Sequence, residues 1–389
     1  MAHNDPPMLR TSERRAFKRC QKRWWWGYRE GLKPYGFADP LWFGIGVHLA
    51  LAAWYCGPGL RRGPEPAETW EAYAGDSIRT AKTTQAGDEG LVDRWTDLKD
   101  LGVTMLKGYR ELYGNDDYID VIAPEQIFSL DIPWPDDIDA LRAILDPERL
   151  GQVLVTYKGT FDLPFRDLRS GKILIGETKT CKAISLDHLS LDDQAGSYWA
   201  VSQRTLRTAG LIGPKDFVAG VEYNFLRKAT PDDRPKDAEG YATNKPLKAD
   251  YIKMLDNTST DLGSVLTEPA LKKMKLDELA VLADKAGIIV MGERSKVQPP
   301  PLFAREIIWR TRPERRTQLL RIQDEALHME LVREGILVPT KNPSRDCRWD
   351  CEFFGLCELD EQSVPTEEFR ELQFRIEDPY ADHRKSTDD

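Results

Sequence analysis

The chain contains little histidine or cysteine and no long apolar run. Its 389 residues include 5 His and 6 Cys. No apolar stretch approaches the roughly 20 residues of a membrane helix, which excludes a helical membrane-spanning protein, and the polar, basic beginning lacks the apolar stretch of a secretory signal. We therefore expect a cytoplasmic protein without membrane contact. Because thiols stay reduced there, the cysteines are candidates for metal or cluster ligands rather than disulfides.

The sequence also lacks the Gly-x-x-x-x-Gly-Lys-(Ser/Thr) loop that holds nucleotide phosphates. This absence excludes a helicase or ATPase of that class, and we expect no nucleotide cofactor. Positive charge is in deficit, with 55 Lys and Arg against 64 Asp and Glu and a net charge of −9. The total does not exclude a nucleic-acid binder, because phosphate binding depends on local basic patches.

What the chain does contain is the composition of an ordinary globular protein. Apolar residues make up 41% and charged residues 31% of the sequence, as is typical of soluble folded domains. We expect an N-terminal part over 1–40, in which Ser12 caps a basic helix over 13–30. The main body is expected over 41–226, with a helical insertion near 60–115. The remaining parts are expected to be an insertion at 227–300, a C-terminal part with three cysteines at 301–360, and a disordered acidic tail at 361–389.

Hydrophobic periodicity predicts helices early in the chain and strands in its middle. Helices are expected at 41–55, 67–84, 93–113 and 188–208. Strands are expected at 119–133, 152–168, 172–179 and 216–226, with a hairpin turn at Ser170 and Gly171. A further strand and a long helix are expected within 305–335. This mixture of elements predicts an α/β protein.

Three charged side chains lie where two of these strands are expected to meet. Asp162 lies in the strand 152–168, and Glu177 and Lys179 end the next strand. Residues two apart on a strand share a face, so Glu177 and Lys179 point the same way, and a hairpin would bring Asp162 to them. Carboxylates hold Mg²⁺ or Mn²⁺, which activates water for phosphodiester cleavage, and a lysine stabilises developing charge. Taken alone, Glu-x-Lys is more often an exposed ion pair.

Four short motifs extend this pattern in a fixed order. Gly44-Ile-Gly46-Val-His48 is similar to a Gly-x-x-x-His helix, and Gly159-Thr-Phe-Asp162 is similar to a Gly-x-x-Asp strand. Glu177-Thr-Lys179 resembles an (Asp/Glu)-x-Lys strand end, and Gln194-Ala-Gly-Ser-Tyr198 resembles a Gln-x-x-x-Tyr helix. Together they resemble the RecB-like branch of the PD-(D/E)XK nuclease superfamily, and within it the stand-alone nucleases of CRISPR-associated or phage type.

The resemblance implies a restriction-endonuclease-like α/β core with a central mixed sheet flanked by helices. It also implies metal ligation by His48, Asp162, Glu177 and the carbonyl of Thr178, catalysis by Lys179, and a supporting or DNA-contacting role for Gln194 and Tyr198. Plainer interpretations exist for the flanking residues. A lone helical histidine is usually a core residue, and two residues four apart on a helix can form a simple surface pair. Glu125 could join the acidic cluster, but we favour a structural role for it.

Three cysteines near the end of the sequence form a C-x3-C-x5-C cluster, Cys347, Cys351 and Cys357. A closed thiolate site needs a fourth ligand, and Cys20 in the basic helix is the best candidate. RecB-like nucleases with a cluster carry one cysteine before the histidine helix and three at the C-terminus. The resemblance therefore implies a [4Fe–4S] cluster that joins the N- and C-terminal segments.

Alternatives to this assignment stay open. The family often has proline after the first cysteine, where this chain has Gln21. Cys56 and Cys181 are the other candidates for the fourth ligand, although both are more simply explained as buried free thiols. Four thiolates also bind Zn²⁺ well, so zinc is the alternative to iron and sulfur.

The resemblance implies a metal-dependent exonuclease acting on single-stranded DNA ends, in recombination, repair or phage DNA processing, with recombination or replication proteins as partners. For a phage-encoded protein, the cytoplasm would be that of the host. The alternative is a non-catalytic DNA-binding or assembly subunit, although a retired site should have lost a carboxylate or the lysine. We expect the Lys and Arg residues of 10–23 to contact DNA phosphates, and at least two of Trp24, Trp25 and Trp26 to pack in the core.

Overall fold

The computed structural model describes residues 6–36, 39–84, 89–256 and 266–381. The chain divides into two compact units, one formed by Met1–Lys228 and Phe303–Asp389 and the other by Ala229–Leu302. The smaller unit occupies the region for which the sequence predicts an insertion. Along the described residues, no helix combines the length and the apolar character needed to cross a membrane.

A mixed five-stranded sheet forms the centre of the larger unit, in the order β3-β6-β7-β8-β9. Only β7 and β8 are parallel, and the other neighbours are antiparallel. The hairpin between β6 and β7 turns at Gly171, whose φ of 69° suits glycine. The strands are β3 (Ile119–Val121), β6 (Leu163–Asp167), β7 (Lys172–Cys181), β8 (Val218–Arg227) and β9 (Phe303–Trp309).

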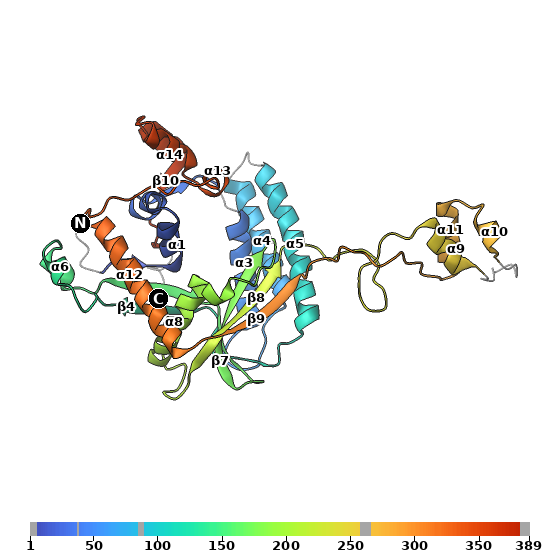
Figure 1. Cartoon of the computed structure of the whole chain (residues 1–389), viewed down its shortest axis with the longest axis horizontal. Coiled ribbons are helices and arrows are strands. Elements are labelled where there is room, and N and C mark those ends of the chain that lie inside the picture. The colour runs from blue at the N-terminus through green and yellow to red at the C-terminus, as the bar shows by residue number, and fades with distance from the viewer. Residues whose placement is uncertain (1–5, 37–38, 85–88, 257–265, 382–389) are drawn as a thin grey trace. The chain divides into compact units, whose positions relative to one another are not determined.

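Helices cover both faces of this sheet. Figure 1 shows α3 (Asp39–Trp54), α4 (Pro66–Thr84) and α5 (Glu89–Tyr113) on one side and α8 (Asp193–Thr208) and α12 (Arg312–Arg333) on the other. Successive side chains of β7 pack on opposite faces of the sheet. Ile173 and Ile175 belong to the core under α8 and α12, whereas Leu174 belongs to the core under α3–α5. The predicted α/β fold with a mixed sheet between helices is confirmed.

Small residues allow the three helices α3–α5 to pack closely. The Trp70 ring is fully buried between Gly46 of α3 and Gly102 of α5. A Cβ atom would lie 2.4 Å from the ring at Gly46 and 2.2 Å from it at Gly102. Any larger residue at either position would push the tryptophan, and with it α4, away from its neighbours.

A smaller sheet, in the order β1-β5-β4, lies beside the central one. It contains β1 (Met8–Leu9), β5 (Val155–Phe161) and β4 (Gln126–Ile132). The strand predicted at 152–168 is thus two strands, because β5 pairs with β4 whereas β6 pairs with β7. The strand predicted at 119–133 is likewise divided into β3 and β4. Periodicity cannot detect such a change of partner, because both halves keep an apolar face.

The basic N-terminal helix is shorter than the sequence predicts. α1 (Thr11–Arg19) already includes Ser12, which therefore does not cap it. Cys20 has an extended backbone, with φ −167° and ψ 117°, and ends the helix. The extended residue turns the chain toward the C-terminal cysteines, a tertiary constraint that helical periodicity does not contain. Two short elements follow, α2 (Gln21–Trp24) and a π-helical turn (Trp25–Arg29).

The acidic C-terminal segment is partly structured, which corrects the expectation of a disordered tail from residue 361. α15 (Glu367–Gln373) leads into β10 (Phe374–Ile376), and β10 pairs with β2 (Leu32–Pro34). Phe374 is buried in a small apolar cluster with Trp26 and Phe353. A few aromatic contacts therefore order a segment whose average composition is that of a disordered one. Residues 382–389 lie outside the described residues.

Several short helices complete the chain. In the larger unit they are α6 (Asp139–Arg142), α7 (Pro147–Leu150), α13 (Cys347–Asp350) and α14 (Phe354–Glu361). The smaller unit contains α9 (Lys248–Leu255), α10 (Glu268–Leu271) and α11 (Leu276–Lys285). These three helices enclose a separate apolar core that includes Leu255, Leu271 and Leu279. A core of its own is what makes this insertion a compact unit.

Candidate metal centre and active site

Asp162 lies at the junction where β5 of the smaller sheet gives way to β6 of the central sheet. Its carboxylate accepts a hydrogen bond from the Thr178 backbone N–H at 2.8 Å. Its backbone carbonyl accepts one from the Glu125 N–H at 2.9 Å. The junction residue is therefore tied both to the end of β7 and to the loop before β4. This double attachment fixes the Asp162 carboxylate beside the sheet end where Glu177 and Lys179 lie.

His48, Glu125 and Asp162 form the one group of candidate metal ligands in the described part of the chain whose ligand atoms all lie within 4.8 Å of one another. His48 Nδ1 lies 3.5 Å from Asp162 Oδ2 and 3.7 Å from Glu125 Oε1. Burial lowers the pKa of His48, but the two carboxylates outweigh it and raise that pKa to about 11. A metal ion would replace the imidazolium proton as the positive charge between these carboxylates.

Glu125 is the residue that sequence reasoning underestimated. The expected structural role is corrected by the position of its carboxylate beside His48 and Asp162. The backbone of Glu125 has φ of 46°, a left-handed conformation that is uncommon for a residue other than glycine, aspartate or asparagine. Such strain is typical of functional positions. No local pattern in the sequence predicts this conformation, because it depends on the hydrogen bond to Asp162.

Glu177 and Lys179 form a buried pair at the end of β7. Lys179 Nζ lies 2.6 Å from Glu177 Oε1 and donates to Gln194 Oε1 of α8 at 2.9 Å. Burial raises the pKa of Glu177 to about 7, even though Lys179 acts to lower it. Burial acts to lower the pKa of Lys179, but the Glu177 carboxylate outweighs it, so the pKa is raised. The lysine therefore keeps its positive charge inside the protein.

One oxygen of this pair is left without a partner. Glu177 Oε2 is buried and has no hydrogen-bond partner among the groups that the structure describes. A buried anionic oxygen without a donor is costly, and a cation is the partner that a carboxylate oxygen accepts most readily. The residues present at this sheet end, two further carboxylates and an imidazole, are the donor types that divalent metals take.

Gly159 and Tyr198 position the strand that leads to Asp162. A Cβ atom at Gly159 would lie 2.8 Å from the Phe128 ring and 3.2 Å from the Tyr198 ring. The Tyr198 ring packs against Phe128 and Phe161 with centroid separations of 5.4 and 5.9 Å. The Gly-x-x-Asp and Gln-x-x-x-Tyr segments thus meet at an aromatic contact, in which Tyr198 supports the strand while Gln194 reaches Lys179.

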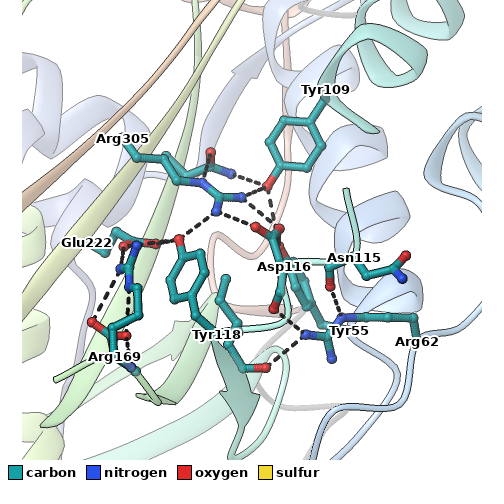
Figure 2. A network of polar contacts seen from close by, with 12 residues as sticks. Tyr55, Arg62, Tyr109, Asn115, Asp116, Tyr118, Arg169, Glu222 and Arg305 are labelled. Carbon is teal, nitrogen blue, oxygen red and sulfur yellow. Dashed lines mark hydrogen bonds and ion pairs between the residues drawn. The ribbon is translucent and has the colours of Figure 1, made fainter. Parts of the chain in front are cut away.

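A buried polar network lies on the α3 side of the sheet (Figure 2). The Arg305 guanidinium donates to both oxygens of Asp116, at 2.6 and 2.8 Å. Tyr55 donates to the same carboxylate at 2.6 Å, and the Tyr118 hydroxyl donates to Glu222 at 3.1 Å. A short Asp-to-Arg pair with two parallel bonds is among the strongest side-chain contacts, so this network is a rigid part of the fold.

The network borders the candidate metal centre. One small cavity, large enough for water, is lined both by His48, Glu125 and Asp162 and by Glu222, Asn224 and Arg305 of the network. Tyr55 directly follows α3, the helix that carries His48. Its bond to Asp116 therefore fixes the end of α3 and, through the helix, the height of His48 above the sheet.

Most of the N-terminal basic residues have acidic partners within the protein, which the expectation of DNA contact did not include. Arg14 is fully buried and donates to Glu325, Ser197 and Asp193, the last two on α8. Others pair with acidic residues of the C-terminal segment, Arg19 with Asp350, Lys22 with Asp360 and Arg23 with Glu352. The prediction for the tryptophans is confirmed, since Trp24 and Trp26 are each 1% exposed.

The four predicted cluster cysteines come from the two ends of the chain, which lie side by side in the larger unit. The segment around Cys20 is joined to the segment before Cys347 by hydrogen bonds, from Lys22 N–H to the Thr340 carbonyl at 3.1 Å and from Asn342 to the Arg19 carbonyl at 3.0 Å. The ion pairs of Arg19, Lys22 and Arg23 reinforce this contact. Basic charge in the first helices thus serves to hold the C-terminal segment.

The thiols of these residues are free and partly buried. The Ser344 backbone N–H donates to Cys347 Sγ at 3.3 Å and lowers the pKa of Cys347 despite partial burial. Burial raises the pKa of Cys357, and the neighbouring Cys20 and Cys347 add to the rise. Across the described residues, no three of the four sulfur atoms come within 4.8 Å of one another. Cys56 is exposed, which corrects the expectation of a buried thiol, and Cys181 is half-buried at the end of β7.

A mixed sheet between helical layers, with carboxylates, an imidazole and a lysine at one strand end, defines an α/β protein with a candidate divalent-metal centre. The sequence model of the PD-(D/E)XK nuclease superfamily matches residues 11–358 of the chain. The chain therefore belongs to the PD-(D/E)XK nuclease superfamily, whose members cleave phosphodiester bonds with divalent metals such as Mg²⁺ or Mn²⁺. No curated protein matches the chain in sequence.

Proposed function

We propose that the protein is a metal-dependent exonuclease that hydrolyses single-stranded DNA from its ends. The observation that carries this proposal is the intact set of Asp162, Glu177 and Lys179 at one end of the sheet, beside His48 and Glu125. A protein that used this fold only to bind DNA would have no need of a buried lysine and a partnerless carboxylate oxygen. Recombination, repair or phage DNA processing in a cytoplasm is the proposed setting.

His48, Glu125, Asp162 and Glu177 are the residues that would hold the metal, with the Thr178 carbonyl as a further ligand. Thr178 lines the same cavity as His48, Glu125 and Asp162, which supports its inclusion. When bound, a divalent ion would polarise a phosphodiester oxygen and lower the pKa of a water molecule. The unpaired Glu177 oxygen fits this group because it has no other partner among the described residues. A bound ion would take the place of the His48 proton between the Asp162 and Glu125 carboxylates.

The protein's own contribution to the reaction comes from the lysine. Lys179 keeps its proton because Glu177 lies at 2.6 Å, and Gln194 fixes the direction of its ammonium group. Held there, the ammonium group stabilises the charge that develops on the phosphate oxygens in the transition state. Because the glutamine comes from α8, the position of that helix matters for the rate.

We also propose that Cys20, Cys347, Cys351 and Cys357 hold a [4Fe–4S] cluster. The resemblance of the cysteine distribution to that of RecB-like nucleases with a cluster supports this proposal, although no three of the four sulfur atoms, all from described residues, lie within 4.8 Å of one another. Four thiolates also bind Zn²⁺, which is the alternative. The cluster would fasten the first helices to the C-terminal segment.

An assay on end-labelled single-stranded DNA tests the enzymatic proposal. Anaerobically purified protein with Mn²⁺ or Mg²⁺ should shorten the strand progressively, whereas Asp162→Ala and Lys179→Ala should lower the rate by about 10²–10³-fold. A circular single strand of the same sequence separates exonuclease from endonuclease action. If the wild type binds DNA but leaves it intact, the non-catalytic alternative holds and the exonuclease is wrong.

A further inference from the structure

A second site for DNA is suggested by a basic and aromatic groove at the far end of the sheet. This groove is lined by residues of the β6–β7 hairpin, the segment before β8 and the end of β9, including Arg166, Lys172, Lys215, Asp216, Trp309 and Arg310. It lies at the beginning of β7, whereas Glu177 and Lys179 lie at its end. Glu177 lies five positions after Lys172, which corresponds to about 17 Å along the strand.

Trp309 is unusually exposed for its type. The residue ends β9, and 48% of it is exposed. Its partner across the sheet is Gly220, which provides no side chain to cover the ring. Lys172 Nζ lies 4.5 Å from the ring centre. A half-exposed indole beside a lysine offers a stacking surface and a positive charge together, which is the combination that single-stranded nucleic acids bind.

The positive charge around the tryptophan is not neutralised by the protein. Lys172 and Lys215 line the groove, are exposed and make no ion pair within the described part of the chain. The carboxylates beside these lysines are already engaged, Asp216 with Arg166 at 3.2 Å and with the Gly213 N–H, and Asp167, the cross-strand partner of Lys172, with Arg169 at 2.9 Å. In a chain with a net charge of −9, a surface of this sign points to an anionic partner.

Arg315, near the start of α12, is affected by the positive charge of its neighbours. Its guanidinium donates to the Val218 carbonyl at 3.1 Å and stacks over Trp199 at 4.5 Å. Burial lowers the pKa of Arg315 to about 10, and the charges of Arg207 and Arg312 add to the fall. Like charges are thus held close together near the start of α12, which adds to the positive potential on this side of the larger unit.

We propose that this groove, which we call the Trp309 groove, binds a single strand of DNA, with a base on Trp309 and phosphates on Lys172 and Lys215. The inference rests on the proposed DNA substrate. A strand held there and at the metal centre would contact the protein at both ends of β7. The groove would then raise the affinity for longer strands without taking part in the cleavage of the phosphodiester bond.

Binding without cleavage tests the groove separately from the enzyme. The full-length protein in EDTA is titrated into a fluorescein-labelled oligothymidine, and anisotropy is followed at several salt concentrations. Trp309→Ala should weaken binding by about tenfold, as expected when one base no longer stacks, and Trp309→Phe should restore most of it. Lys172→Ala with Lys215→Ala should reduce the slope of log K against log salt by about 1.4, or roughly 0.7 for each phosphate that is no longer neutralised.

Matched controls come from other surfaces of the larger unit. Tyr35→Ala removes an exposed aromatic residue, and Lys82→Ala with Lys107→Ala removes two exposed lysines from α4 and α5. These variants should bind as the wild type does, and melting temperatures should show that every variant is folded. If the wild type binds the oligothymidine and the groove variants keep its affinity and salt slope, the groove proposal is wrong. The exonuclease proposal is then unaffected.

The remaining outcomes are also decisive. A wild type that neither binds nor degrades DNA overturns both proposals. Weaker binding by the lysine variants but not by Trp309→Ala would mean that the groove attracts a polyanion without stacking a base, which overturns the single-strand assignment. Equal effects of the variants on a duplex of the same length would overturn it as well, because a duplex presents no free base face to Trp309.

Discussion

The carboxylate of Asp162 accepts the backbone N–H of Thr178 at 2.8 Å, which joins the kink between two sheets to the end of a third strand. Through this bond β5 of the smaller sheet and β6 and β7 of the central sheet meet at Asp162. The bond also explains why Asp162 occurs at the only residue between β5 and β6. Strand pairing on both sides leaves the aspartate free to turn its side chain toward Glu177 and Lys179.

We expect Glu125→Gln to weaken Mn²⁺ binding by at least about tenfold. The carboxylate lies within reach of both His48 and Asp162, and the amide keeps its size but loses its charge. Isothermal titration calorimetry of the folded variant measures the change. Asp131→Asn, which alters an exposed acid of β4, the strand that follows Glu125, serves as the control. If Glu125→Gln binds Mn²⁺ as tightly as the wild type does, Glu125 is not a metal ligand.

We expect Gly46→Ala to destabilise the protein by about 1–3 kcal/mol. A methyl group there would lie 2.4 Å from the Trp70 ring, so α3 and α4 must separate. Gly44→Ala on the same helix is the matched control, because its Cβ would meet only the Thr180 hydroxyl at 3.8 Å. Where nothing obstructs the methyl group, alanine stabilises a helix over glycine by up to about 1 kcal/mol. The free energy of unfolding should therefore rise in Gly44→Ala and fall in Gly46→Ala. Urea denaturation measures both.

The ion pair of Arg305 with Asp116 should be worth far more than a surface pair. Its side chains are 10% and 2% exposed, so Asp116→Asn or Arg305→Met leaves an unmatched charge inside the protein. Breaking such a pair costs about 3–5 kcal/mol. The double variant should lose less than the sum of the single variants, because neither charge is then left alone. Additive losses in a thermodynamic cycle would contradict this view of the network.

Stability should fall at acid pH through Asp193. Burial acts to raise the pKa of Asp193, but Arg14 and Lys18 outweigh it and hold the pKa below its usual value. A carboxylate with a depressed folded pKa stabilises the protein above its unfolded pKa of about 3.9. That contribution is lost as the pH falls through the folded pKa. The free energy of unfolding of Asp193→Asn should therefore vary less below pH ~5 than that of the wild type, whereas Asp97→Asn, an exposed acid on α5, should follow the wild type.

We expect Cys351→Ala to lower the melting temperature and the iron content together. If the four cysteines hold a cluster, its loss removes binding energy that is coupled to folding. Absorbance, iron and sulfide analysis, and thermal unfolding of anaerobically prepared protein measure the effect. Cys56→Ala, an exposed thiol outside the set, should change none of them. A colourless wild type with stoichiometric zinc would show that the site is a zinc site.

The sequence determined the class of fold and the order of its motifs, because both depend on local information. Periodicity predicts the core helices α3–α5 and the strands β7 and β8 to within a few residues, since an apolar face must repeat at the period of its element. It also predicts that Glu177 and Lys179 point the same way, since the strand period alone decides this. The family match over residues 11–358 agrees with motifs that lie on four different elements.

Only the tertiary structure decided how these motifs combine. The break at Cys20, the change of strand partner at Asp162 and the left-handed backbone of Glu125 all arise from contacts with residues distant in sequence. The use of the basic N-terminal residues is another such case, because Arg14 looks like a DNA contact until Asp193 and Glu325 are seen beside it. Charge and propensity are local properties, whereas the partner of a buried charge is set by the packing of the whole chain.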